Sequence, residues 1–140
     1  MVREEALIKL ARIQIVVILV FIILKLIRPF VLEEVSIDFV RIIVLSFPNL
    51  AEGIVGTLIL TGILLLFFRR FMKSEKPGNT TIYLLSGFLA AVYVLLQEFK
   101  IHNLGGNNIY DPNDVLFSIL GLGLGLIIVF RIRPEIKINP

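Results

Sequence analysis

Four long apolar stretches dominate this sequence and limit what the chain can fold into. They cover about residues 6–27, 50–68, 80–97 and 114–130. Crossing the roughly 30 Å of hydrocarbon in a bilayer takes about 20 mostly apolar residues, and a helix satisfies its own backbone hydrogen bonds there. The hydrophobic share of 57% is above the usual range of soluble domains. We therefore predict an all-α integral membrane bundle of four transmembrane helices, forming a single domain over 1–140.

The first of these stretches contains the shortest uninterrupted apolar run. Only residues 13–24 separate Arg12 from Lys25, so the stretch crosses the membrane only if the flanking basic side chains extend toward the two surfaces. A cleaved signal peptide is the alternative, but no pair of small residues suited to cleavage follows the run. We expect a retained span.

A further apolar segment, residues 36–47, is too short to cross the membrane. Ser36 stands where a helix N-cap would be expected, and Asp38 and Arg41 lie one turn apart. We predict a short separate helix that lies on the membrane surface or re-enters it, rather than a fifth span.

Basic residues gather on one side of the predicted bundle. Ten of the 14 Lys and Arg residues fall on the side of Arg69, Arg70 and Arg131, whereas seven of the 11 acidic residues fall on the other side. The positive-inside rule makes the basic side cytoplasmic, so both termini are predicted to be cytoplasmic and the loop at 102–114 to face the exterior. The net charge of +3 then reflects topology, and we expect no nucleic-acid partner.

Small residues recur along one side of each of the last three stretches. In lipid, helices associate through close van der Waals contact and interhelical hydrogen bonds, both of which small residues permit. We expect these three stripes to face one another. They are Gly53, Thr57 and Thr61; Gly87, Ala90 and Ala91; and Ser118, Gly121 and Gly125.

Polar and acidic residues collect where the last three spans reach the non-basic side. They are Asn49, Glu52, Gln97, Glu98, His102, Asn108, Tyr110, Asp111 and Asp114. If the small-residue stripes bring three helices together, these ends converge, so we predict one outward-facing polar mouth that binds a ligand. Ionisable groups at membrane depth are costly, which favours a functional role for them.

Helix capping is the competing explanation for part of this set. The sequence Asp111-Pro112-Asn113-Asp114 has the spacing of an N-cap, a proline at the first helical position and an acidic residue at the third. Asn49 and Glu52 repeat that spacing at the predicted start of the second span. Capping explains neither Gln97 and Glu98 nor His102.

The same residues leave two chemical alternatives open. The carboxylates could supply an acid and a base, with His102 moving protons, or they could offer oxygen ligands to Mg²⁺ or Ca²⁺. No spacing typical of a nucleophile or a metal site is present, and the chain has no cysteine. We therefore favour a binding role over catalysis and predict no cofactor and no metal. A transporter is disfavoured because the spans carry few polar residues at mid-depth.

Three short motifs mark the non-basic ends of the last three spans. Asn49-Leu50-Ala51-Glu52 opens one span, Gln97-Glu98 closes the next, and Asp111-x-x-Asp114, followed by Ser118 and Gly121, opens the last. Over residues 48–130 this pattern resembles the VanZ-like family of small bacterial membrane proteins. The chain departs from the family pattern at Asn108, where the family has arginine, and at Ser118, where it has asparagine. The resemblance implies a multi-pass protein of the bacterial inner membrane with a role in the cell envelope.

Three functions remain as hypotheses. The preferred one is non-enzymatic binding of an envelope lipid headgroup or a lipid-linked precursor at the polar mouth. The second is an accessory subunit of a larger bacterial inner-membrane protein complex. The third is an intramembrane enzyme that acts on a lipid-linked substrate.

Overall fold

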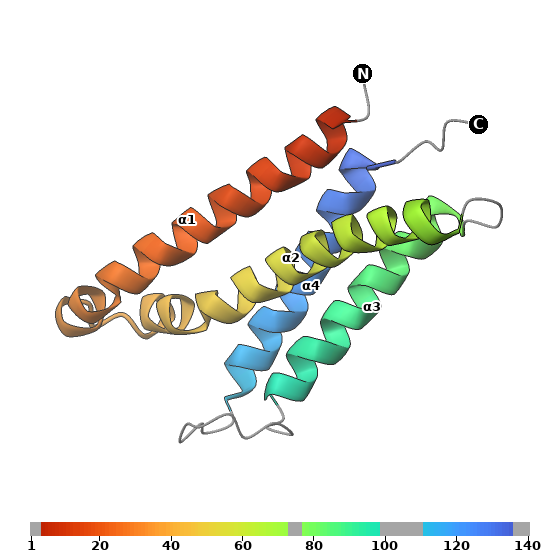
Figure 1. Cartoon of the computed structure of the whole chain (residues 1–140). Helices are drawn as coiled ribbons and strands as arrows, with labels where there is room; N and C mark the ends of the chain where they lie inside the picture. Colours follow the sequence, from red (N-terminus) through yellow and green to blue (C-terminus); the bar gives the residue numbers. More distant parts are fainter. Residues whose placement is uncertain (1–3, 73–76, 99–110, 136–140) are drawn as a thin grey trace.

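Four long α-helices form the described part of the protein. The computed structural model describes residues 4–72, 77–98 and 111–135. The helices are α1 (Glu4–Glu34), α2 (Asp38–Phe71), α3 (Asn79–Glu98) and α4 (Pro112–Ile132) (Figure 1). Each is long and apolar enough to cross a membrane. The chain is an all-α, multi-pass membrane protein, as predicted.

The predicted separate helix over 36–47 is wrong, because residues 38–47 form the first part of α2. This helix continues through Pro48 to Phe71 over 34 residues, about 51 Å at ~1.5 Å per residue. Proline already has a helical φ and costs the helix a hydrogen bond, which neighbouring packing offsets here. Ser36 is not the N-cap either: Ile37 holds that position and makes no side-chain capping bond. A helix longer than the bilayer is thick therefore replaces the expected span and surface helix.

The second helix, α2, is central to the bundle. It packs against each of the other three helices, and most extensively against α4. Within the described residues α1 and α3 do not touch, and Figure 1 shows them on either side of α2. Helix α1 contacts mainly α2, and none of the most apolar part of α1 is buried, against 39% of that of α2.

Helices α2 and α4 approach one another backbone to backbone. A Cβ atom added to Gly121 would collide with the carbonyl oxygen of Leu50. One added to Gly53 would lie 2.8 Å from both the amide nitrogen of Leu122 and the carbonyl oxygen of Ser118. Only glycine fits at these positions, so the prediction that the stripes of these two helices face each other is confirmed.

The stripe on α3 also faces inward. The hydroxyl oxygens of Thr61 and Ser86 lie 2.7 Å apart, and both side chains are fully buried. A Cβ atom on Gly87 would lie 2.7 Å from a methyl carbon of Leu126 on α4. Ala90 is buried, whereas Ala91 is half-buried. The three-helix contact was therefore predicted correctly from the spacing of small residues.

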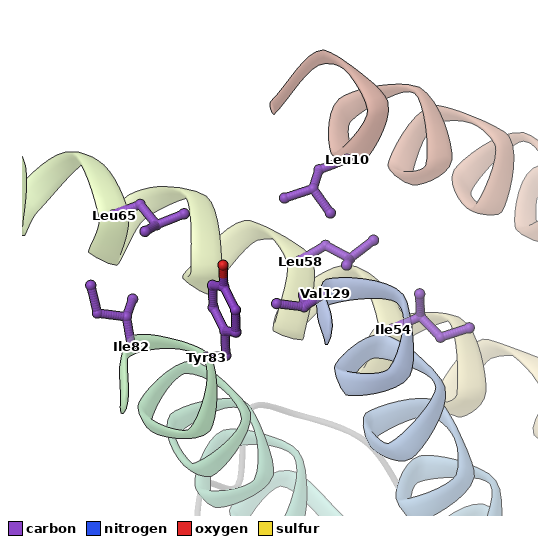
Figure 2. Close-up of a cluster of buried hydrophobic side chains, with 7 residues drawn as sticks. All are labelled: Leu10, Ile54, Leu58, Leu65, Ile82, Tyr83 and Val129. Atoms are coloured by element: carbon purple, nitrogen blue, oxygen red, sulfur yellow. The ribbon is translucent and has the colours of Figure 1, made fainter. Parts of the chain in front are cut away.

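All four helices contribute to one apolar cluster in the half of the bundle that contains Arg69 and Arg131, here called the basic end. Figure 2 shows its buried members, which are Leu10, Ile54, Leu58, Leu65, Ile82, Tyr83 and Val129. The Tyr83 hydroxyl donates a 2.7 Å hydrogen bond to the carbonyl of Pro134, just beyond α4. This bond and the cluster fix the start of α3 beside the ends of α2 and α4.

Replacing Gly121 by alanine tests the close approach of α2 and α4. The added methyl group meets the backbone of Leu50, so the helices must separate, and we expect the free energy of unfolding in detergent to fall by about 1–3 kcal/mol. The matched control is Gly123→Ala on the same helix, because nothing lies within 4 Å of a Cβ atom there. Equal thermal unfolding of the two variants would contradict the packing.

Candidate functional site

The end of the bundle opposite the basic end carries the polar residues singled out in the sequence. There α1 ends at Glu34, α2 begins at Asp38, α3 ends at Glu98 and α4 begins at Pro112. In Figure 1 the connection between α1 and α2 lies at one corner, while the end of α3 and the start of α4 lie together at another. The early start of α2 thus carries its first turns away from α4.

Glu52 is a half-buried carboxylate on α2. Its hydrogen-bond partner is the hydroxyl of Tyr93 on α3. Glu52 lies 17 residues before Arg69, which is about 26 Å along a helix rising ~1.5 Å per residue. With Arg69 at the membrane surface, Glu52 therefore lies just inside the opposite edge of a hydrocarbon core of roughly 30 Å. A carboxylate at that depth requires hydrogen-bond partners.

Asn49 and Glu52 are not capping residues, contrary to the alternative considered from the sequence. Both lie well inside α2, more than two turns after its start at Asp38. Their backbone groups take part in a continuing helix, so no free N–H is present for them to cap. The capping spacing that they share with Asp111 and Asp114 is therefore coincidental.

Asp111, in contrast, is the N-cap of α4. Its side chain accepts a 2.9 Å hydrogen bond from the backbone N–H of Asn113. Pro112 follows at the first helical position, where no N–H is required, and Asp114 lies in the first turn. A negative charge there is favoured by the helix dipole. Capping is thus confirmed as a role of Asp111.

Glu52 and the acidic residues of α4 lie at different depths. Gly53 packs against Ser118, and Asp114 precedes Ser118 by one helical turn, which is roughly 6 Å. The hydrogen-bond partner of Glu52 belongs to α3 and not to α4. Among residues 4–72, 77–98 and 111–135, no three acidic or histidine side chains lie close enough to hold a metal ion.

The remaining predicted site residues belong to α3 and the connection that follows it. Gln97 is exposed in the last turn of α3, and Glu98 is the last residue of that helix. The side chain of Glu98 and all of His102, Asn108 and Tyr110 lie outside the described residues. Their part in a common polar mouth stays a prediction.

Two buried serine hydroxyls near this end have no hydrogen-bond partner among residues 4–72, 77–98 and 111–135. They belong to Ser46 on α2 and Ser118 on α4, and both side chains are at most 1% exposed. Helical serines commonly bond to the carbonyl four residues earlier, and leaving a buried hydroxyl without a partner costs about 1–3 kcal/mol.

Two adjoining grooves lie between α1 and α2 in the non-basic half. The first has a volume of about 200 Å³, and the second has a volume of about 240 Å³. Phe21 and Pro48 line both grooves, and the Glu52 side chain lines the second. Glu52 is therefore accessible from the α1 side while its partner Tyr93 lies on α3.

Sequence reasoning missed the contribution of α1 and the partner of Glu52. The polar mouth was assigned to the last three spans, because only these carry stripes of small residues. Tyr93 precedes Gln97 by four residues, which places both on one face of α3. Lys25 and Arg28 are likewise one turn apart, and both line the first groove. Helical spacing was the available signal in each case.

The helices and the polar end together define a multi-pass α-helical membrane protein with a partly buried carboxylate near one membrane surface. The chain was compared with models of known families, with curated proteins and with solved structures, and none of these matched.

Replacing Asp111 tests whether its role is capping. Asp111→Ala leaves the N–H of Asn113 without its acceptor, so the free energy of unfolding should fall by about 0.5–2 kcal/mol. Asp111→Asn keeps an acceptor oxygen and should unfold close to the unsubstituted protein. If both substitutions are equally destabilising in detergent, the charge of Asp111 matters more than its cap.

Proposed function

We propose that this protein is a VanZ-like, non-enzymatic protein of the bacterial inner membrane, whose non-basic end binds the headgroup of an envelope lipid or a lipid-linked precursor. By the positive-inside rule this end faces away from the cytoplasm, whereas both termini face the cytoplasm. The observation that carries the proposal is Glu52, a half-buried carboxylate near the edge of the hydrocarbon core.

Two further features of Glu52 support this proposal. Its partner among the described residues, the Tyr93 hydroxyl, donates one hydrogen bond, whereas a carboxylate has about four acceptor positions. Headgroup ammonium and hydroxyl groups are the donors available at this depth. Since Glu52 also lines the groove beside α1, a lipid can reach the carboxylate from the surrounding bilayer without the bundle opening.

The other polar residues extend this proposed site toward the membrane surface. Asp114, one turn nearer the surface on α4, and the exposed Gln97 at the end of α3 offer further hydrogen-bonding groups. Glu98, His102, Asn108 and Tyr110 complete the proposed rim.

Thermal unfolding with defined lipids tests this function. We expect phosphatidylethanolamine, or a non-cleavable polyprenyl-linked sugar diphosphate, to stabilise the protein in detergent by up to about 2.7 kcal/mol at 100 times its dissociation constant. Glu52→Gln should reduce that stabilisation, because the amide accepts fewer hydrogen bonds and has no charge.

The control for this experiment is Glu34→Gln, since Glu34 is an exposed carboxylate at the same end of the bundle. It should leave the lipid effect unchanged. The proposal fails if no envelope lipid shifts the unfolding temperature, or if Glu52→Gln responds to lipid as the unsubstituted protein does.

One observation favours the second candidate function, an accessory subunit of a larger inner-membrane complex. Along α1 the side chain of Leu10 is buried, while large apolar side chains from Ile15 to Phe30 are exposed. Such a face is suited to pack against a helix of another subunit as well as against lipid.

Purification in mild detergent separates the two candidates. An accessory subunit should elute in a discrete larger complex, and polar substitutions on the exposed face of α1, such as Leu19→Ser, should release it. The matched change Ile127→Ser on the exposed face of α4 should not. Elution as a monomer in every mild detergent would argue against a complex.

A further inference from the structure

We infer that the first groove between α1 and α2 binds an anionic glycerophospholipid, whose phosphate is held by Lys25 and Arg28 while an acyl chain lies against the aromatic wall. Glu52 does not line this groove, and the inference does not depend on the headgroup site proposed above.

The composition of the groove fits such a lipid. One charged end and one apolar wall occupy a volume of about 200 Å³. Its lining residues are Phe21, Leu24, Lys25 and Arg28 of α1 and Val44, Phe47 and Pro48 of α2. The lining thus contains two cations and no carboxylate. Basic groups beside an apolar surface are what a phosphate attached to hydrocarbon chains requires.

The depth of the two cations adds a second argument. Lys25 and Arg28 line the first groove together with Pro48, which precedes Arg69 by 21 residues, about 32 Å along α2 at ~1.5 Å per residue. With Arg69 at one surface, the two cations therefore lie at the opposite edge of a hydrocarbon core of roughly 30 Å. This is the depth at which a lipid phosphate meets the acyl chains.

The protein itself provides no counter-ion for these two cations in the part that the structure describes. Lys25 has its ammonium nitrogen 5.9 Å from the centre of the Phe21 ring, and neither Lys25 nor Arg28 forms an ion pair within the described residues. The ammonium therefore lies over the aromatic wall that would contact the lipid. The nearest acidic residues of α1, Glu33 and Glu34, are exposed and follow Arg28 by more than one turn.

The apolar wall continues toward the membrane centre. The second groove shares Phe21 and Pro48 with the first and adds the apolar side chains of Ile18, Ala51 and Val55, with Glu52 as its one charged residue. An acyl chain attached to a phosphate at Arg28 can follow these side chains, whereas a free phosphate ion gains nothing from them. A third groove, at the basic end, also contains cations, but Glu5 and Glu135 line it as well. Charge complementarity to an anion is therefore better in the first groove.

Phosphatidylglycerol and phosphatidylcholine distinguish this site by charge. The two lipids share a phosphate and acyl chains, but the choline cation neutralises the phosphate charge of phosphatidylcholine, whereas phosphatidylglycerol stays anionic. We expect the lipid-depleted protein to bind phosphatidylglycerol more tightly than phosphatidylcholine, measured by native mass spectrometry. Lys25→Gln with Arg28→Gln should weaken binding of phosphatidylglycerol at least roughly 10-fold, because each basic residue near a membrane surface contributes about a factor of five.

Three controls accompany the double variant. Arg41→Gln removes an exposed cation of α2 on the same side of the membrane and should bind as the unsubstituted protein does. Lys25→Arg with Arg28→Lys keeps both charges and should retain binding. Thermal unfolding without lipid shows whether the double variant is folded. If it is not, the single variant Arg28→Gln replaces it, and its affinity for phosphatidylglycerol should fall about five-fold.

Two results would overturn the inference. One is equal binding of phosphatidylglycerol by the double variant and the unsubstituted protein. The other is displacement of the lipid by inorganic phosphate at comparable concentration, which would assign the cations to a free anion and leave the apolar wall without a role.

Discussion

The close approach of α2 and α4 determines where every other part of the structure lies. At Gly53 and Gly121 the two backbones touch, so that no side chain separates them. In lipid no hydrophobic effect draws helices together, and such contacts provide the packing that holds them. The contact also fixes the register, because Gly53 must face Ser118 and Leu122. A shift by one residue would place a side chain where only hydrogen fits.

This register accounts for the position of Glu52. Adjacent residues of a helix point about 100° apart, so Glu52 does not share the direction of the Gly53 contact with α4. Glu52 therefore meets Tyr93 rather than the acidic start of α4. The same geometry separates two kinds of polar residue that the sequence treats alike. Asp111 stabilises a helix end, whereas Glu52 stands inside a helix with hydrogen-bonding capacity to spare.

The weaker contact of α1 with the bundle complements this rigid centre. Helices α2 and α4 pack closely through small residues. Helices α1 and α2 instead meet through large side chains such as Phe21 and Phe47, and two grooves lie between them. The proline at position 48 lies where both grooves meet. The two grooves are thus found where large side chains meet, and Lys25 and Arg28 of α1 line the first of them.

Apolar length and helical spacing are local properties, so the four spans and the contacts among the last three could be predicted from the sequence. It also identified Asp111 as a cap. It gave no means to see that α2 begins at Asp38, since a proline in an apolar run is equally consistent with a helix that ends or continues. Because α2 is continuous from Asp38 to Phe71, Asn49 lies inside the helix and does not cap it. Only the tertiary structure gave Glu52 its partner and brought Lys25 to a groove, because these contacts depend on the rotation and register of packed helices.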